Sequence, residues 1–255
     1  GRFDRAESYL RTAVKVITKR NPNPYDSEPL YNLGLCLKYQ GRLDEAYDCF
    51  YKASWSSAQQ DQSFFACAQI SVAQERYEDA LDELERIKEL GLKGVKLHPD
   101  YQGFNVDDIR LKPIYKKISE LGLVTVFHAG FDYGFAPPYG ATPDKMARAL
   151  EWFSSPVVAA HWGGINCNED VIKHLCGKDI YFDISFGYSM MPKYYAEKIM
   201  ALHTPDRMLF GTDTPWHTPD MEKRLLNTLG LTSDDIDKIT HKNAEGLLGL
   251  KNDKL

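Results

Sequence analysis

The stretch Arg207-Met-Leu-Phe-Gly-Thr-Asp-Thr-Pro-Trp216 joins a short apolar run to a carboxylate, Asp213, and to a Pro-Trp turn directly after it. Two earlier apolar runs end in histidine instead: Val124-Thr-Val-Phe-His128 and Val157-Val-Ala-Ala-His161. Such runs are typical of buried parallel strands, and parallel barrels carry their chemistry at the carboxyl ends of their strands. The three endings therefore predict that two imidazoles and one carboxylate meet at one edge of a parallel sheet.

Strand and helix patterns alternate through residues 91–255. Further strands are predicted at 93–98 and 180–185, and Thr142-Pro143 has the N-cap and first-position signature of a helix start. The alternation predicts a parallel α/β fold with five strands, where a closed barrel has eight. Helices are expected at 107–120, from 142 onward, and at 168–175, 192–202, 218–229 and 233–249.

Side-chain alternation along these strands adds polar groups to the same edge. Residues two apart in a strand share a face of the sheet. The pairs expected on the site face are Lys96 and His98, Val126 and His128, Ala159 and His161, Asp183 and Ser185, and Gly211 and Asp213.

The first ninety residues have a different period. Gly1-Arg-Phe-Asp-Arg-Ala6, Gly41-Arg-Leu-Asp-Glu-Ala46 and Glu75-Arg-Tyr-Glu-Asp-Ala80 align, and the offset 75 − 41 is 34 residues. Over roughly residues 1–90 this pattern resembles the tetratricopeptide family, whose helix pairs repeat every 34 residues. Small residues, Gly34 and Ala68, are expected where the paired helices approach closely. Because Gly1 would open the second helix of a repeat whose first helix is absent, the chain is expected to be a fragment.

Such repeats bind peptides or proteins on a concave face, so a protein or peptide partner is expected here. The repeat region is also rich in aromatic residues. Because each repeat must bury its faces against its neighbours, we expect most of these aromatics to fill the core between helices. They are Tyr31, Tyr39, Tyr47, Tyr51, Trp55, Phe64 and Phe65.

Several motifs of the second region resemble the amidohydrolase superfamily, most closely the branch with the carboxymuconate-semialdehyde and resorcylate decarboxylases. The resemblance covers about residues 83–250 and implies a TIM-type barrel, here partial. The motifs are Gly94-Val-Lys-Leu-His-Pro99, Phe127-His-Ala-Gly130, His161-Trp-Gly-Gly164, Phe182-Asp-Ile-Ser185, Leu209-Phe-Gly-Thr-Asp-Thr-Pro-Trp216 and Asn243-Ala-Glu-Gly-Leu-Leu-Gly-Leu250.

The resemblance implies a divalent metal, usually zinc, held by His128 and Asp213. It makes His161 a second ligand or the acid/base, and gives Asp213 the proton of an activated water. Imidazole nitrogen and carboxylate oxygen are ordinary zinc ligands, and zinc lowers the pKa of bound water to about 7. Asp213 and His161 are thus the expected catalytic residues, with His128, His161 and Asp213 on the metal.

Other side chains have two interpretations each. Lys96 is a carboxylated metal-bridging lysine in some superfamily members, and otherwise an ion-paired lysine at the barrel mouth. His98 could contact substrate or make a structural hydrogen bond, and Trp216 could line a pocket or pack. We expect substrate contacts from Lys96, His98 and Trp216, and orienting roles for Asp183 and Ser185. The histidines expected at the surface are His174, His203, His217 and His241.

The sequence contains no His-x-His, the pair that supplies two metal ligands from the first strand of that family. The expected function is a metal-dependent hydrolase of a small molecule, impaired by this loss. Two alternatives stay open: a metal-dependent decarboxylase, and a non-catalytic scaffold of repeats joined to a remnant barrel. The domains are predicted as 1–90 and 91–255, joined through a shared helix near Asp82–Arg86.

Composition limits the remaining classes. The net charge of −5 disfavours nucleic acid as a partner, and no apolar run approaches the ~20 residues of a membrane helix. Five cysteines without CxxC spacing indicate reduced thiols and predict a cytoplasmic location. An open five-stranded sheet exposes two edges, so the repeat helices or a second copy of the chain, as a homo-oligomer, would cover them.

Overall fold

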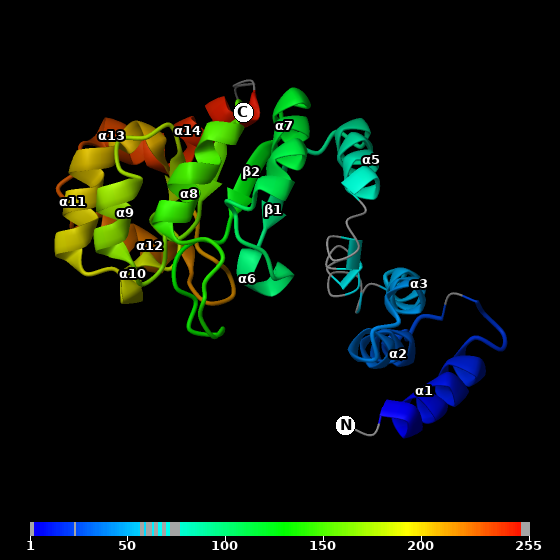
Figure 1. Cartoon of the computed structure of the whole chain (residues 1–255). Helices are drawn as coiled ribbons and strands as arrows, with labels where there is room; N and C mark the ends of the chain where they lie inside the picture. Colours follow the sequence, from blue (N-terminus) through cyan, green and yellow to red (C-terminus); the bar gives the residue numbers. More distant parts are fainter. Residues whose placement is uncertain are drawn as a thin grey trace. The chain divides into compact units, whose positions relative to one another are not determined.

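A computed structural model describes residues 3–22, 24–56, 59, 63, 66–67, 70–71 and 77–250. The chain forms two compact units, Gly1–Ala80 and Leu81–Leu255, and each is described by itself. Helices followed by a parallel α/β unit are the fold class that the sequence predicts (Figure 1).

Unit 1 contains the helices α1 (Phe3–Ile17), α2 (Glu28–Tyr39) and α3 (Leu43–Ala53). The close approach predicted at Gly34 is confirmed, because a Cβ there would lie 2.7 Å from the ring of Phe50. Ala46 is fully buried in the same contact, whereas Ala68 lies outside the described residues. The buried core of unit 1 consists of Leu33, Leu37, Ala46, Phe50, Ala66, Cys67 and Ile70.

The expectation that the repeat aromatics fill the core is wrong for Tyr39, Tyr51 and Trp55, which are 71%, 49% and 64% exposed. The helix α3 buries one stripe at helical spacing, Ala46, Phe50 and Ala53. Tyr51 follows Phe50 by about 100° around the helix and therefore leaves that stripe. Tyr31 and Tyr47 are partly buried against the core. Phe64 and Phe65 lie outside the described residues.

Unit 2 is built on five parallel strands in chain order, as predicted. They are β1 (Gly94–Leu97), β2 (Val124–Phe127), β3 (Val157–Ala159), β4 (Tyr181–Asp183) and β5 (Met208–Leu209). The α-helices are α5 (Tyr77–Glu89), α6 (Pro99–Gln102), α7 (Lys112–Glu120), α8 (Pro143–Ala149), α9 (Asn168–His174), α10 (Gly187–Met190), α11 (Lys193–His203), α12 (Pro219–Leu226), α13 (Ser233–Asp237) and α14 (Asn243–Leu248). Short 3-10 turns span Ile109–Leu111, Leu150–Trp152 and Pro205–Arg207, and a π-helical turn spans Lys238–Lys242.

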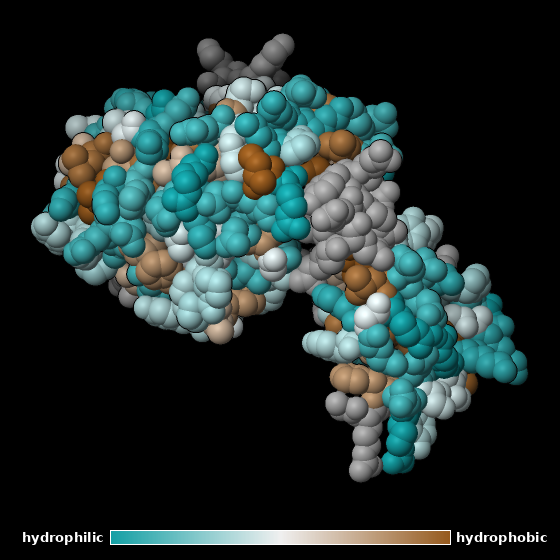
Figure 2. Space-filling model, viewed as in Figure 1, coloured by the Kyte–Doolittle hydropathy of each residue, from teal (hydrophilic) through white to brown (hydrophobic). Residues whose placement is uncertain are grey.

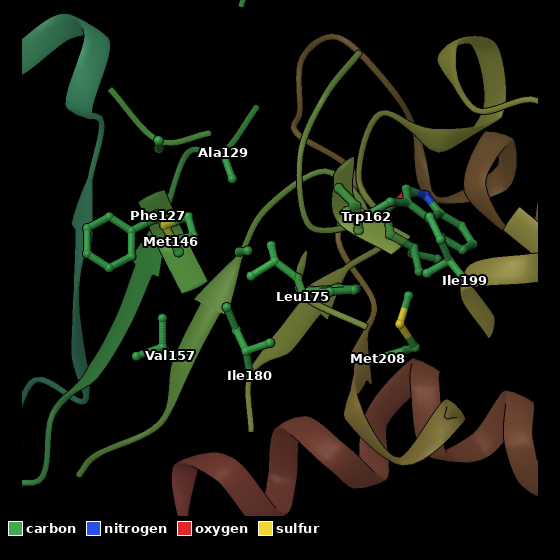
Figure 3. Close-up of a cluster of buried hydrophobic side chains, with 14 of the residues drawn as sticks. Phe127, Ala129, Met146, Val157, Trp162, Leu175, Ile180, Ile199 and Met208 are labelled. Carbon is green, nitrogen blue, oxygen red and sulfur yellow. The ribbon is translucent and has the colours of Figure 1, made fainter. Parts of the chain in front are cut away.

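The two faces of the sheet have separate cores. The helix-covered face carries the larger core, which includes Phe127, Val157, Trp162 and Met208 (Figure 3). Figure 1 shows α8, α9 and α11 side by side on this face. On the opposite face, Val124, Val158 and Leu209 are buried against Ala244, Leu247 and Leu248 of α14. The last helix thus covers part of this opposite face of the sheet.

The helix α5 spans the junction of the two units. Leu84 is 6% exposed and belongs to the core of unit 2, and Glu85 forms an ion pair with Lys117 of α7. The second half of α5 therefore packs with the barrel unit. The assignment of residues 1–90 to the repeat domain stays a prediction from the sequence pattern.

The visible outer surface of the helices is mainly hydrophilic, with separate hydrophobic patches (Figure 2). Within the described residues, no helix combines the length and apolar character that crossing a membrane requires. All five cysteines are free thiols.

Candidate functional site

His128 and Asp213, two of the polar residues predicted at the strand ends, lie just beyond the strands. His128 follows β2 directly, and its backbone N–H donates to the Leu97 carbonyl at 2.9 Å, which keeps it in sheet register. Asp213 lies four residues after the end of β5. The carboxyl ends of the strands therefore hold the predicted residues, although the strands themselves are shorter than predicted.

His161 reaches the site by a different route from the predicted one. Val157 and Ala159 point to the helix-covered core, and Val158 to the opposite face, so strand alternation would place residue 161 away from His128. Strand β3 ends at Ala159, and His161 and Trp162 take left-handed conformations with φ 60° and 58°. This turn reverses the expected side, and the expectation that Ala159 and His161 share a face is wrong.

A chain of hydrogen bonds connects four side chains at this edge. His128 Nδ1 lies 3.1 Å from His161 Nε2, and His161 Nδ1 lies 2.9 Å from the Ser185 hydroxyl. Ser185 donates to Asp183 Oδ1 at 2.5 Å. The same carboxylate oxygen accepts the backbone N–H groups of His161 and Ser185 at 2.9 and 3.0 Å. Asp183 and Ser185 thus have the orienting contacts expected of them.

The direction of the protons follows from the Ser185 hydroxyl. Because its one hydrogen goes to Asp183, its oxygen accepts from His161, which fixes the proton of His161 on Nδ1. Burial lowers the pKa of His161, while the charges of Asp183 and Asp213 raise it, so the ring is neutral and its Nε2 is an acceptor. His128 then donates from Nδ1, and its Nε2 carries a lone pair.

That lone pair lies beside a carboxylate. His128 Nε2 is buried and has no hydrogen-bond partner among the described residues. Its nearest acidic group is Asp132 Oδ2 at 3.4 Å, and His98 Nε2 lies 3.7 Å from the same oxygen. A nitrogen lone pair that faces a carboxylate repels it, and a cation between them would remove the repulsion.

His98, His128 and Asp132 are a candidate metal site, since their ligand atoms lie within 4.8 Å of one another. Donors held about 2.0–2.2 Å from a tetrahedral ion lie roughly 3.4 Å apart, which matches the two observed separations. Burial lowers the pKa of His128 to about 2 and that of His98 to about 4, so both imidazoles are neutral at pH 7, as metal binding requires.

One feature of the cluster opposes simultaneous coordination. The rings of His98 and His128 are stacked, with centroids 3.9 Å apart and planes 12° apart. The lone pair of an imidazole nitrogen lies in the ring plane, so two nearly parallel rings do not point at one ion. Binding by both histidines would turn one ring out of the stack. Both rings are also held outside the stack, because His98 Nδ1 accepts the Tyr101 backbone N–H at 3.4 Å and His128 Nδ1 lies 3.1 Å from His161 Nε2.

Asp132 is the residue that the sequence patterns missed. It lies in the loop after β2, four residues beyond His128, where no strand or helix period marks it. Its one signal was the spacing of a carboxylate four residues after a strand-terminal histidine.

The other predicted site residues surround this cluster less closely. Asp213 is exposed and has φ 57°, and it is not part of the three-residue ligand cluster within the described chain. Burial lowers the pKa of His161 and that of Lys96, and the negative charges of Asp183 and Asp213 oppose both shifts. Lys96 is exposed on edge strand β1, and surrounding protein lowers its pKa. Trp216 is 71% exposed.

Two histidines expected at the surface are buried, so that expectation is wrong for them. His203 is fully buried, accepts the Gly177 backbone N–H at Nδ1, and stacks on Phe182. His217 is 4% exposed and pairs with the fully buried Glu222. A buried polar partner, which periodicity does not reveal, explains both positions. His241 is exposed, as expected.

Comparisons with known proteins identify the families that the two parts of the chain match. The model of the family described as amidohydrolase matches residues 54–250, and that of subunit 3 of the anaphase-promoting complex, or cyclosome, matches residues 5–87. No curated protein matches the chain.

Solved structures match the barrel fold at low identity. A TIM-barrel protein from Bordetella bronchiseptica is 24% identical with a TM-score of 0.55, over 68% of this chain and 62% of that protein. The chain thus spans less than two thirds of that relative. A 2,6-dihydroxybenzoate decarboxylase from Rhizobium is 13% identical (TM-score 0.53, 82% and 79% covered). A dihydroxybenzoic acid decarboxylase from Polaromonas with bound manganese is 16% identical (TM-score 0.54, 79% and 77% covered).

Proposed function

Because the chain belongs to the amidohydrolase family, we propose that unit 2 is a metal-dependent hydrolase acting on a small-molecule substrate. The observation that carries the proposal is the buried, unpartnered Nε2 of His128 beside the Asp132 carboxylate. It lies at the carboxyl ends of parallel strands, where barrel enzymes hold their reacting groups.

His128 and Asp132 would hold the ion, with His98 as a third ligand once its ring leaves the stack. Two imidazoles and a carboxylate form a set typical of zinc, which makes zinc the proposed metal. A divalent ion at this place would polarise a carbonyl group and activate a water molecule.

The surrounding side chains have separate roles in the proposal. The chain from Asp183 through Ser185 and His161 fixes the tautomer of His128, as outer partners of metal-bound histidines do. Asp213, exposed at the same edge, is the proposed proton acceptor, and His161 completes the acid/base pair. His128, His161 and Asp213 as a joint ligand set would require Asp213 to approach the histidines.

Lys96, His98 and Trp216 are proposed to contact substrate. Lys96 places a positive charge at the open edge of the sheet, where it would attract an anionic group. Trp216 offers an exposed aromatic surface in the turn after Asp213, whose carbonyl accepts the Trp216 backbone N–H at 3.0 Å.

A second function is proposed for unit 1, the binding of a protein or peptide. The match of residues 5–87 to a repeat-containing subunit and the exposed side chains of Tyr39 and Trp55 favour it. Exposed aromatic side chains are enriched where proteins bind one another. In that case the chain would serve as a non-catalytic scaffold of repeats joined to a remnant barrel.

The experiment is a hydrolysis screen of esters and lactones with zinc-loaded chain and the variants Asp213→Asn and His128→Ala. Asp213→Asn should lower kcat/KM about 100-fold or more, since a positioned acid/base contributes 10²–10⁴-fold. His128→Ala should lower it at least as much, because it removes a proposed metal ligand. His241→Ala, which removes an exposed histidine, is the control and should match the unmodified chain. Release of carbon dioxide from hydroxybenzoates without any hydrolysis would replace the proposal by a decarboxylase. Zinc-loaded chain with neither activity would favour the scaffold.

A further inference from the structure

The hydrogen-bonded chain of His128, His161, Ser185 and Asp183 is called the relay below. A buried acid–base pair lies close to this relay but outside it. His217 Nδ1 contacts Glu222 Oε1 in a short hydrogen bond, and the two side chains are 4% and 0% exposed. His217 precedes α12, and Glu222 lies in its first turn. Burying an ion pair seldom adds stability, because desolvation offsets the attraction. Such a pair therefore suggests a role in holding a particular geometry.

The ring of His217 packs face to face on Phe186. The ring centroids are 4.6 Å apart and the planes differ by 2°. Phe186 has φ 62°, a left-handed conformation that a bulky residue keeps only when its surroundings hold it. His217 supplies a flat surface that holds the Phe186 ring.

Phe186 in turn touches the relay on two sides. It follows Ser185, whose hydroxyl contacts His161 Nδ1. Its ring also meets the His161 ring edge to face, with centroids 6.1 Å apart and planes 74° apart, within the range of favourable aromatic pairs. Movement of Phe186 would therefore disturb both the Ser185 hydroxyl and the space next to His161.

We propose that His217, anchored by Glu222, is a positioning residue whose ring holds Phe186 and thereby keeps His161 in its Nδ1–H tautomer. In this proposal it is the aromatic ring of His217, and not its charge, that holds Phe186. The inference rests on the proposed function only for its consequence for zinc affinity, because the tautomer can be measured in metal-free protein.

The test uses two double variants of the full chain that differ only in the ring at position 217. His217→Phe with Glu222→Leu keeps an aromatic ring and removes the hydrogen bond between the two side chains. His217→Leu with Glu222→Leu removes both. Neither variant leaves a buried carboxylate unpaired, which would destabilise the fold for an unrelated reason.

The readout is long-range ¹H–¹⁵N NMR of the imidazoles, with His161 assigned by the loss of its signals in His161→Gln. The phenylalanine variant should show His161 as Nδ1–H, like the unmodified chain. The leucine variant should show a mixture with Nε2–H. Zinc affinity should fall about 10-fold in the leucine variant, as expected for loss of an outer partner, and stay unchanged in the phenylalanine variant.

Two results would overturn the inference: an unchanged His161 tautomer in the leucine variant, or equal changes in both variants, which would assign the effect to the hydrogen bond between His217 and Glu222. If the leucine variant does not fold by circular dichroism, Phe186→Leu removes the stack from its other side and should give the same mixture. Failure of the proposed function is separate, since absent zinc binding and hydrolysis would leave the tautomer result intact.

Discussion

At the scale of single residues, the decisive feature is the lone pair of His128. Its direction depends on one hydroxyl hydrogen two side chains away, because Ser185 donates to Asp183 and so fixes the protons on His161 and His128. The sequence predicted His128 and His161 at one edge, since strand-terminal histidines are visible in a pattern. It could not predict Asp132, which reaches the cluster through a loop, nor the left-handed turn that brings His161 to His128.

A buried histidine away from the metal cluster predicts how stability depends on pH. Burial lowers the pKa of His203 from 6.5 to about 4. The folded chain keeps the ring neutral while the unfolded chain protonates it, so its contribution is complete above pH 6.5 and is lost as pH falls toward 4. From pH 7 to pH 5 this residue should remove about 2 kcal/mol of unfolding free energy.

His203→Phe tests this expectation by urea unfolding at pH 7 and pH 5. The variant keeps the stack on Phe182 but cannot be protonated, so its pH-dependent loss should be smaller by about 2 kcal/mol even if it is less stable at both values. His241→Ala should leave the difference unchanged. Equal pH dependence in His203→Phe and the unmodified chain would show that His203 is not held neutral.

At the scale of helices and strands, the sequence predicted the order and type of the elements better than the face on which each side chain lies. The five parallel strands and the helix α14 follow from apolar runs and helical periods. The exposed Tyr51 and the buried His217 did not follow, because a period identifies a stripe but not its neighbours. The face of His161 was missed because the strand ends two residues before it.

Two helical glycines, Gly34 in unit 1 and Gly246 in unit 2, should respond in opposite ways to substitution by alanine. A Cβ at Gly34 would lie 2.7 Å from the buried Phe50 ring, whereas Gly246 in α14 has nothing within 4 Å. Alanine gains roughly 1 kcal/mol over glycine inside a helix, and overpacking costs about 1–3 kcal/mol. Gly34→Ala should therefore destabilise α2 and α3, and Gly246→Ala should stabilise its helix. Hydrogen exchange of the helix amides measures both effects. If the amides of α2 and α3 exchange no faster after Gly34→Ala, the repeat packing is contradicted.

At the scale of the whole molecule, α5 is where the two sequence patterns meet. The two family models both match residues 54–87, and α5 lies partly within that overlap. Its first residues continue the repeat pattern, while Leu84 enters the core of unit 2. A helix can satisfy both patterns, because each uses a different part of it.

Leu84→Ala should therefore destabilise unit 2 and leave unit 1 unchanged. Removing a buried leucine side chain costs about 2–5 kcal/mol. Amides of β2 and β3 should exchange faster, with no change for those of α2 and α3. Leu90→Ala, at a position that is 61% exposed, is the matched control and should have an effect within about 0.5 kcal/mol. Loss of protection in α2 and α3 instead would assign α5 to the repeats.

Zinc titration by calorimetry is the most direct test that unit 2 carries a metal site at its strand ends. The unmodified chain should bind one ion, and His128→Ala and Asp132→Asn should each weaken binding roughly 100-fold or more, because each removes a ligand where loss of an outer partner alone costs 10–100-fold. The exposed-histidine control His241→Ala should bind as tightly as the unmodified chain. Absence of saturable binding, or binding by Asp132→Asn as tight as that of the unmodified chain, would contradict the site.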